Sequence, residues 1–180
     1  MKYIFGLGLP RTCTNSLGSA LHLLNINGEC KCILNDFKNK REKDNGSSNY
    51  KYIIYNDAYE DLDMLLSSDK IRGNKYILTS RNGDDWKQSI QNFEEDKREL
   101  VSALLDLDMD EYISTVKEYF EENQCIENLL IIDIFTEDRA TLWGKLFEFL
   151  DIPVDEDILE LPFPKINLNE ERNFEKQSQR

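Results

Sequence analysis

The sequence predicts a three-layer α/β protein in which helices cover both faces of a mostly parallel sheet of roughly four to five strands. Two observations carry this prediction. Short apolar runs alternate with amphipathic patterns along the chain, and one run, Leu129 to Ile132, is apolar at every position. Such a run is typical of a strand buried on both faces of a parallel sheet. At 180 residues the chain suits one domain with a substantial core. We therefore expect one domain over residues 1–168, with an exposed flexible loop at about 36–49 and a polar tail at 169–180.

Each element is predicted from its own pattern. The first strand is an apolar run that begins at Ile4, and the helix after it has apolar residues at helical spacing from Leu17 to Leu24. Two β-rich runs, at 50–55 and 76–80, are each followed by a helical pattern. Further expected elements are a short strand at 30–34, helices at 57–66 and 84–93, and one or two amphipathic helices at 100–120.

The last predicted helix follows the strand at 129–132. We expect Thr136 to be its N-cap, with acidic residues in the first turn, and Pro153 to end it. Its apolar residues recur at helical spacing, which predicts a buried stripe on one face. The stripe consists of Leu142, Trp143, Leu146, Phe147 and Leu150.

A turn rich in Gly, Pro and Thr lies between the first strand and the first helix. In such a turn, successive backbone N–H groups point inward and the following helix presents its positive N-terminal end, so the turn binds anions. The charge pattern agrees, because Lys2 and Arg11 are the only acidic or basic side chains before Glu29 in a strongly acidic chain, His22 being counted neutral. The sequence therefore predicts an anion site directly after the first strand.

Two common phosphate-binding loops do not fit this turn. A Walker A loop, G-x-x-x-x-G-K-[ST], aligned on Gly8 has Cys13, Thr14 and Asn15 where Gly, Lys and Ser/Thr are required. The lysine and the magnesium-binding hydroxyl are therefore missing. A dinucleotide-binding G-x-G-x-x-G has Arg11 in place of its third glycine, which would block close packing of the helix.

Two motifs resemble those of the sulfotransferase superfamily. Residues 9–17, LPRTCTNSL, are similar to its 5′-phosphosulfate loop, P-[KR]-[ST]-G-T-[TS]-[SW]-L, with Cys13 in place of the glycine and Asn15 in place of a hydroxyl residue. An apolar strand that ends in Arg81, with Ser89 eight residues further on, looks like the 3′-phosphate segment of the same superfamily. Two such motifs in the right order, each after an apolar strand, are more specific than either one alone.

A third resemblance, over residues 129–167, is to the end of a small P-loop sulfotransferase-like family, so that most of the chain outside 29–49 and 94–125 is covered. The resemblance implies a P-loop form of the fold and a protein that transfers a sulfuryl group from 3′-phosphoadenosine-5′-phosphosulfate to a hydroxyl or amine, without a metal. It assigns Arg11 a catalytic role at the loop. The nucleotide-binding residues that it implies are Pro10, Arg11, Thr12, Cys13, Thr14 and Asn15 at the 5′ end, and Arg81 and Ser89 at the 3′-phosphate.

The general base is assigned by resemblance as well. Larger sulfotransferases have His or Glu after the second motif strand, and the small family has an Asp followed shortly by Pro. Here Asp57 matches the aspartate, while Tyr59 stands in place of the proline. A helix N-cap is an equally good interpretation of Asp57, and one residue can serve both roles.

Two functions other than sulfuryl transfer remain as alternatives. A catalytically degenerate nucleotide-binding module of the same fold is suggested by Cys13, by Asn15 and by the missing glycine-rich third motif of larger sulfotransferases. A P-loop nucleotide kinase would need the Walker lysine and a magnesium site, and neither is visible in the sequence. Lys165 is a further cation that we consider for the site, and Trp86 is expected to be a packing residue.

The charge of the chain restricts its partners. The net charge is −13, and residues 94–122 hold eleven carboxylates against three basic residues. An acidic protein repels nucleic acid and anionic membranes, so we expect neither as a partner. The acceptor is expected to be a neutral or cationic small molecule, or a basic peptide.

The remaining features indicate the compartment. Four irregularly spaced cysteines and one histidine, His22, do not form a usual zinc set, so we expect reduced thiols and no metal. His22 lies off the apolar face of its helix and is expected at the solvent side. No apolar run is long enough to span a bilayer. A cytoplasmic protein is the expectation that follows.

Overall fold

Five strands form one parallel sheet at the centre of the protein. The structure is a computed structural model and describes residues 2–31, 50–55, 66, 73–92, 102 and 104–165. The strand order is β2-β3-β1-β4-β5, and all four pairings are parallel. The strands are β1 (Lys2–Gly6), β2 (Asn27–Lys31), β3 (Tyr50–Tyr55), β4 (Lys75–Thr79) and β5 (Leu129–Ile132).

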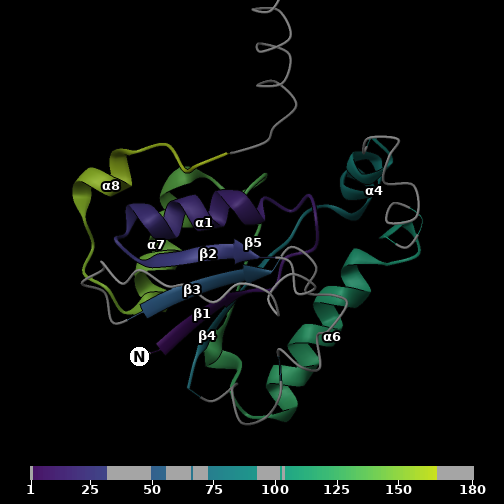
Figure 1. Ribbon diagram of the computed structural model, residues 1–180, viewed down its shortest axis with the longest axis horizontal. Coiled ribbons are helices and arrows are strands. Elements are labelled where there is room, and N and C mark those ends of the chain that lie inside the picture. The colour runs from purple at the N-terminus through teal and green to yellow at the C-terminus, as the bar shows by residue number, and fades with distance from the viewer. Residues whose placement is uncertain are drawn as a thin grey trace, which may run out of the picture.

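Helices lie on both faces of this sheet, so the predicted three-layer α/β/α fold is confirmed (Figure 1). Two helices, α1 (Thr14–Leu23) and α7 (Arg139–Leu150), pack on one face. The other face is covered by α4 (Gly83–Gln91) and α6 (Met109–Glu122). A short 3-10 helix, η4 (Ile126–Asn128), precedes β5, and α8 (Glu156–Glu160) follows α7.

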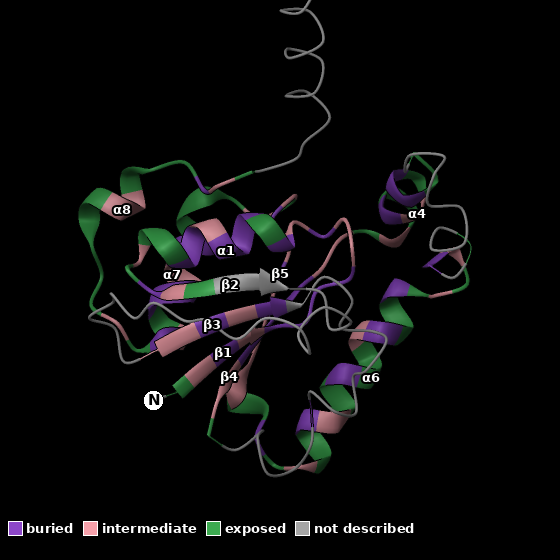
Figure 2. Ribbon diagram, in the orientation of Figure 1, coloured by how far each residue is buried: buried purple, intermediate pink, exposed green. Residues whose placement is uncertain are grey.

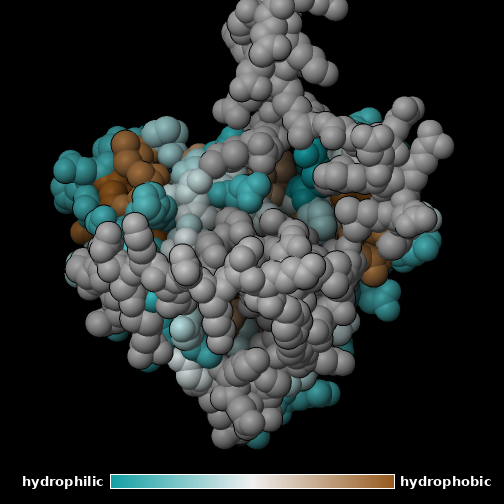
Figure 3. Space-filling model, viewed as in Figure 1, coloured by the Kyte–Doolittle hydropathy of each residue, from teal (hydrophilic) through white to brown (hydrophobic). Residues whose placement is uncertain are grey.

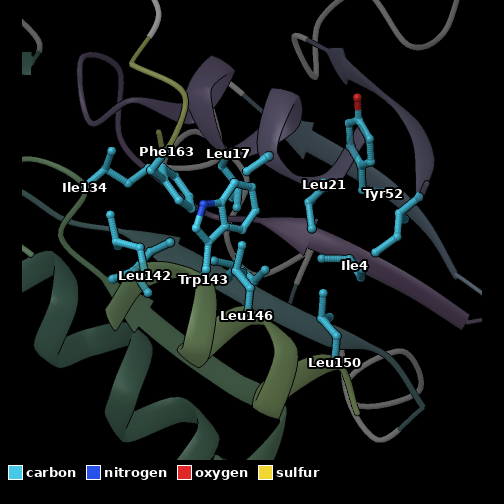
Figure 4. Packing of buried hydrophobic residues seen from close by; sticks show 14 of the residues in the cluster. Ile4, Leu17, Leu21, Tyr52, Ile134, Leu142, Trp143, Leu146, Leu150 and Phe163 are labelled. Carbon is cyan, nitrogen blue, oxygen red and sulfur yellow. The ribbon is translucent and has the colours of Figure 1, made fainter. Parts of the chain in front are cut away.

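The sheet has a separate hydrophobic core on each face, because successive side chains of a strand point to opposite faces. Ile4 and Ile77 pack under α1 and α7, whereas Tyr76 and Leu78 pack under α4 and α6. Figure 2 shows that α1, α4 and α6 each carry both buried and exposed residues. In the first core, Trp143 is fully buried, and Figure 4 shows it among Leu17, Leu146 and Phe163. The predicted stripe of α7 is confirmed at all five positions.

Two predicted boundaries are wrong. The second strand begins at Asn27 rather than at residue 30, because Asn25 adopts a left-handed turn (φ 57°) and Ile26 is already buried against the sheet. Helix α7 begins at Arg139 with Asp138 as its N-cap, rather than with Thr136. The reason is a turn upstream, in which the Asp133 carboxylate accepts hydrogen bonds from the N–H groups of residues 135 and 136.

Several other predictions can be placed. One amphipathic helix of the region 100–120 is present as α6, and His22 is exposed, as expected. The flexible loop at 36–49, the helix at 57–66 apart from Leu66, and the tail at 169–180 lie outside the described residues. Within the described part of the chain, none of the helices has the length and apolar character needed to cross a membrane.

Candidate anion-binding site

The two sequence motifs lie side by side at the carboxyl ends of β1 and β4. The loop of residues 7–13, here called the β1–α1 loop, follows β1, and Arg81 follows β4. The Leu7 N–H donates to the Ile77 carbonyl oxygen at 2.9 Å, which fixes the start of the loop against β4. The strand order reverses direction between β1 and β4, and open parallel sheets bind ligands in the crevice at such a point.

The loop has an unusual backbone conformation. Arg11 (φ 71°) and Cys13 (φ 64°) both adopt the left-handed conformation, which costs a residue with a Cβ about 1–2 kcal/mol and costs glycine nothing. The sulfotransferase-like pattern has glycine at the position of Cys13. Cys13 therefore holds, at a cost in strain, a backbone conformation that glycine adopts freely.

Thr12 braces the loop from inside. Its N–H and its hydroxyl both donate to the Leu9 carbonyl oxygen, at 3.2 and 2.6 Å. Its Oγ1 also lies 2.8 Å from Thr79 Oγ1 in β4, and the side chain is fully buried. A Cβ built on Gly8 would lie 1.8 Å from Thr79 Oγ1 and 2.6 Å from Thr12 Oγ1, so only glycine leaves room for this pair.

The N-terminus of α1 faces this loop without an acidic or capping side chain. The N-cap residue, Cys13, makes no side-chain cap bond, and the first turn holds no carboxylate. The other described α-helices are all capped by an Asn or Asp side chain. The first N–H groups of a helix have no partner within the helix, and its dipole is positive at this end. The turn Thr14–Ser16 therefore favours an anion.

Helix α4 holds the loop through two polar contacts. Arg11 Nε donates to Ser89 Oγ at 3.1 Å, which joins the two motifs across 78 residues of sequence. Trp86 Nε1 donates to the Pro10 carbonyl oxygen at 2.8 Å, and the indole is fully buried. Trp86 is thus a packing residue, as expected, and it also positions the loop.

Arg81 is held by an aromatic ring. Its guanidinium carbon lies 4.1 Å from the centroid of the Phe135 ring, an arrangement in which the ring attracts the cation. Its Nε is buried and has no hydrogen-bond partner among the described residues. A buried donor without a partner is costly, so an anion that accepts from Arg81 would remove this cost.

Three cations surround the start of α1. The positive charges of Arg81, Lys165 and Arg11 each favour the thiolate of Cys13, as does a hydrogen bond with Ser16. Burial is the larger effect, however, and it raises the pKa of the Cys13 thiol above its ordinary value. Cys13 is therefore a neutral thiol at neutral pH, and the positive charges of the three cations act on the same place.

The structure brings together most of the residues proposed from the sequence. The described ones are Pro10, Arg11, Thr12, Cys13, Thr14, Asn15, Arg81 and Ser89, all at the carboxyl edge of β1 and β4 or on the helices that start there. Thr14 and Ser89 are largely buried, whereas Asn15 is exposed. The candidate base, Asp57, lies outside the described residues.

Sequence reasoning missed four residues that support the site. They are Gly8 and Thr79, which lock the loop to β4, Phe135, which holds Arg81, and Tyr112 of α6. The Tyr112 hydroxyl donates to the Leu7 carbonyl oxygen at 2.8 Å, and burial raises the pKa of this phenol. The available signals were a polar Thr79 at the end of an apolar strand and a tyrosine on a buried helix face, since a buried tyrosine hydroxyl needs a partner.

The part of the chain that the structure describes contains no cluster of three His, Cys, Asp or Glu residues arranged to hold a metal ion. Comparisons with other proteins add no assignment. No protein-family model matches this chain, and no curated protein matches it in a sequence search.

Proposed function

We propose that this protein is a sulfotransferase-like enzyme that transfers a sulfuryl group from 3′-phosphoadenosine-5′-phosphosulfate to a hydroxyl or amine of an acceptor. The observation that carries the proposal is the contact of Arg11 with Ser89 beside the unpaired Nε of Arg81. The donor has phosphate groups at both its 5′ and 3′ ends. Two arginines from two different motifs, one of them bonded to the Ser89 hydroxyl, suit such a ligand better than one that carries a single phosphate group.

The enzyme would mainly position the two substrates and stabilise the charge that develops in the transition state, without a covalent intermediate. The acceptor oxygen or nitrogen attacks sulfur, the bond between sulfur and the 5′-phosphate oxygen breaks, and the phosphate keeps the electron pair. Negative charge grows on the leaving phosphate, where Arg11 and the N-terminal dipole of α1 stabilise it. The proton of the acceptor passes to a general base, for which Asp57 remains the sequence-based candidate.

The individual residues take different parts in this proposal. Thr12 acts through the loop, because its N–H and hydroxyl are bonded to Leu9 and Thr79. The amides of residues 13–15 face the 5′-phosphosulfate, and Arg81 with Ser89 receives the 3′-phosphate. Lys165 supplies further positive charge near the start of α1.

The two rivals differ in how well they fit. A kinase would need a lysine at the position of Thr14, which is a buried threonine, and a magnesium-binding hydroxyl at the position of Asn15. A nucleotide-binding module without catalysis needs only the anion site, and the strained Cys13 favours it as the second candidate. Turnover of sulfur-labelled donor with candidate acceptors separates the module from the enzyme. We expect Asp57→Asn to abolish most turnover, by about 10²–10⁴-fold for a general base, and to leave nucleotide affinity nearly unchanged.

Calorimetry with the product nucleotide tests the proposal without knowledge of the acceptor. Adenosine 3′,5′-bisphosphate should bind much more tightly than AMP or ADP, and without magnesium. A charge-assisted hydrogen bond contributes on the order of 1.5–3 kcal/mol, so Arg81→Ala should weaken the bisphosphate by about tenfold to a hundredfold. AMP lacks the 3′-phosphate, and its affinity should hardly change.

Two further variants control this experiment. Arg11→Ala should weaken the bisphosphate and AMP alike, because both place a 5′-phosphate at the loop. Arg139→Ala removes an exposed arginine that pairs with Glu160, and it should change neither affinity. Equal affinity for AMP and the bisphosphate, or magnesium-dependent ATP binding that displaces both, would rule the proposal out.

A further inference from the structure

The segment after α7 exposes apolar side chains to solvent. Val154 is 61% exposed and Leu161 is 40% exposed, and they are two of the four large apolar residues that are exposed in the described part of the chain. Pro153 and Pro162, next to them in sequence, are exposed as well. We call these four residues the α8 patch. Figure 3 shows apolar surface over α8 with hydrophilic residues around it.

The border of the α8 patch is strongly acidic. Between residues 148 and 160 the chain has six carboxylates and no lysine or arginine. Each of these carboxylate residues is exposed. They are Glu148, Asp151, Asp155, Glu156, Asp157 and Glu160. One of them, Glu160, pairs with Arg139. Exposed apolar groups that are rimmed by charged residues are typical of a recognition surface rather than of ordinary protein surface.

A cleft continues the patch. It has a volume of about 550 Å³ and lies between the start of α7 and residues 162–165. Pro162 belongs to both the patch and the cleft, and the apolar part of the cleft is completed by Leu142 and Phe163. Two carboxylates, Glu137 and Asp138, and two cations, Arg139 and Lys165, also line the cleft, so the acidic character of the surface comes from the α8 patch rather than from the cleft. The cleft is large enough to receive one large side chain of a bound partner.

The patch is held in place before any partner binds. Trp143 Nε1 donates to the Leu161 carbonyl oxygen at 3.1 Å, and Arg139 Nη1 donates to the Glu160 carbonyl oxygen at 2.7 Å. The Phe163 ring lies 4.7 Å from the Trp143 ring, centroid to centroid. A surface that is already ordered loses little conformational entropy on binding.

We propose that the α8 patch and the adjoining cleft bind a cationic amphipathic segment of a partner protein. An apolar side chain of the segment enters the cleft, its apolar face covers Val154 and Leu161, and its lysines or arginines face the carboxylates. A second copy of this chain does not fit, because it would bring two sets of the same carboxylates together in a protein of net charge −13. An anionic membrane is repelled for the same reason. The surface goes beyond the proposed transferase function and does not depend on it.

A model peptide tests this surface on the full chain. The probe is a fluorescein-labelled amphipathic peptide with the sequence (LKKLLKL)₂, measured by fluorescence anisotropy. Val154→Ser combined with Leu161→Ser should weaken its binding by about tenfold or more, since apolar contact area is lost from the centre of the surface. The matched control combines Leu23→Ser with Ile126→Ser, at side chains that are 41% and 43% exposed elsewhere. That control should bind the peptide like the wild type.

A second pair of variants tests the charge. Glu156→Gln with Asp157→Asn removes two charges beside the patch, and Glu121→Gln with Glu122→Gln removes two from the exposed end of α6. The first pair should weaken binding and reduce its salt dependence more than the second. A peptide with glutamate in place of every lysine should not bind. Equal losses in the test and control variants, or unchanged binding in the Val154/Leu161 variant, would overturn the proposal. Failure of bisphosphate binding would overturn the transferase alone.

Discussion

Trp86 Nε1 donates to the Pro10 carbonyl oxygen at 2.8 Å, and this bond ties helix α4 to the β1–α1 loop. We expect Trp86→Phe to leave that carbonyl without its partner and to cost about 1–3 kcal/mol in unfolding free energy. The loop, which includes Arg11, would also lose its fixed position relative to α4. Bisphosphate affinity should therefore fall together with stability, as measured by calorimetry and denaturant unfolding.

A matched substitution separates these two effects. Trp143 is equally buried, and its Nε1 also donates to a backbone carbonyl, that of Leu161, in the segment that follows α8. Trp143→Phe should destabilise the protein to a similar extent without a change in nucleotide affinity. If both variants lose affinity equally, Trp86 has no special role at the loop.

Replacement by alanine should change the stability of the protein in opposite directions at two glycines, Gly8 and Gly144. Gly8→Ala puts a Cβ 1.8 Å from Thr79 Oγ1, and such overpacking costs about 1–3 kcal/mol. Gly144 lies inside α7 with no atom within 4 Å of an added Cβ. Gly144→Ala should stabilise the protein by about 0.5–1 kcal/mol, because alanine favours the helix. Thermal unfolding of the two variants checks both signs, and a neutral Gly8→Ala would contradict the close contact.

The left-handed conformation of Cys13 can be measured with two small substitutions. Cys13→Ala and Cys13→Gly both remove the thiol, but only glycine removes the backbone strain. The glycine variant should be more stable than the alanine variant by about 1–2 kcal/mol. Chemical unfolding of both measures the difference. A more stable alanine variant would mean that Cys13 is not left-handed in solution.

The cap of α7 predicts a pH dependence. Hydrogen bonds from the Thr141 hydroxyl and the Thr141 N–H hold the pKa of Asp138 below its ordinary value. Because the folded pKa is the lower one, this stabilisation is complete above the unfolded value of about 3.9 and is lost as pH falls through the folded pKa. Asp138→Asn keeps a capping oxygen that does not titrate. The stability difference between wild type and this variant should therefore shift against the wild type on acidification, and Thr141→Val should reduce that shift.

Much of the fold follows from local patterns. The apolar run from Leu129 to Ile132 and the stripe that contains Trp143 each depend on residues close in sequence, and both are confirmed. The start of α7 could not be predicted in the same way. Thr136 and Asp138 are both acceptable caps, and the choice depends on the Asp133 carboxylate, which binds the N–H of Thr136.

The candidate site also contains residues that local sequence patterns predict and residues that they do not. Arg11 and Arg81 could be found because each follows an apolar strand, and parallel strands place their carboxyl ends at one edge. The residues that hold the loop and Arg81 in place could not be predicted from the sequence. Phe135 contacts Arg81, and Thr79 contacts Thr12, only because particular strands are neighbours in the sheet. No local sequence pattern predicts the order of the strands.

The position of β1 in the sheet has a consequence for how the chain acquires its structure. β1 is hydrogen-bonded on one side to β3, from residue 50, and on the other to β4, from residue 75. During synthesis, the apolar residues of β1 therefore emerge long before either neighbour exists. Sheets of such distant pairings form slowly. The exposed strand would meanwhile be open to aggregation or to chaperones, and the anion site would assemble only after β4 has left the ribosome.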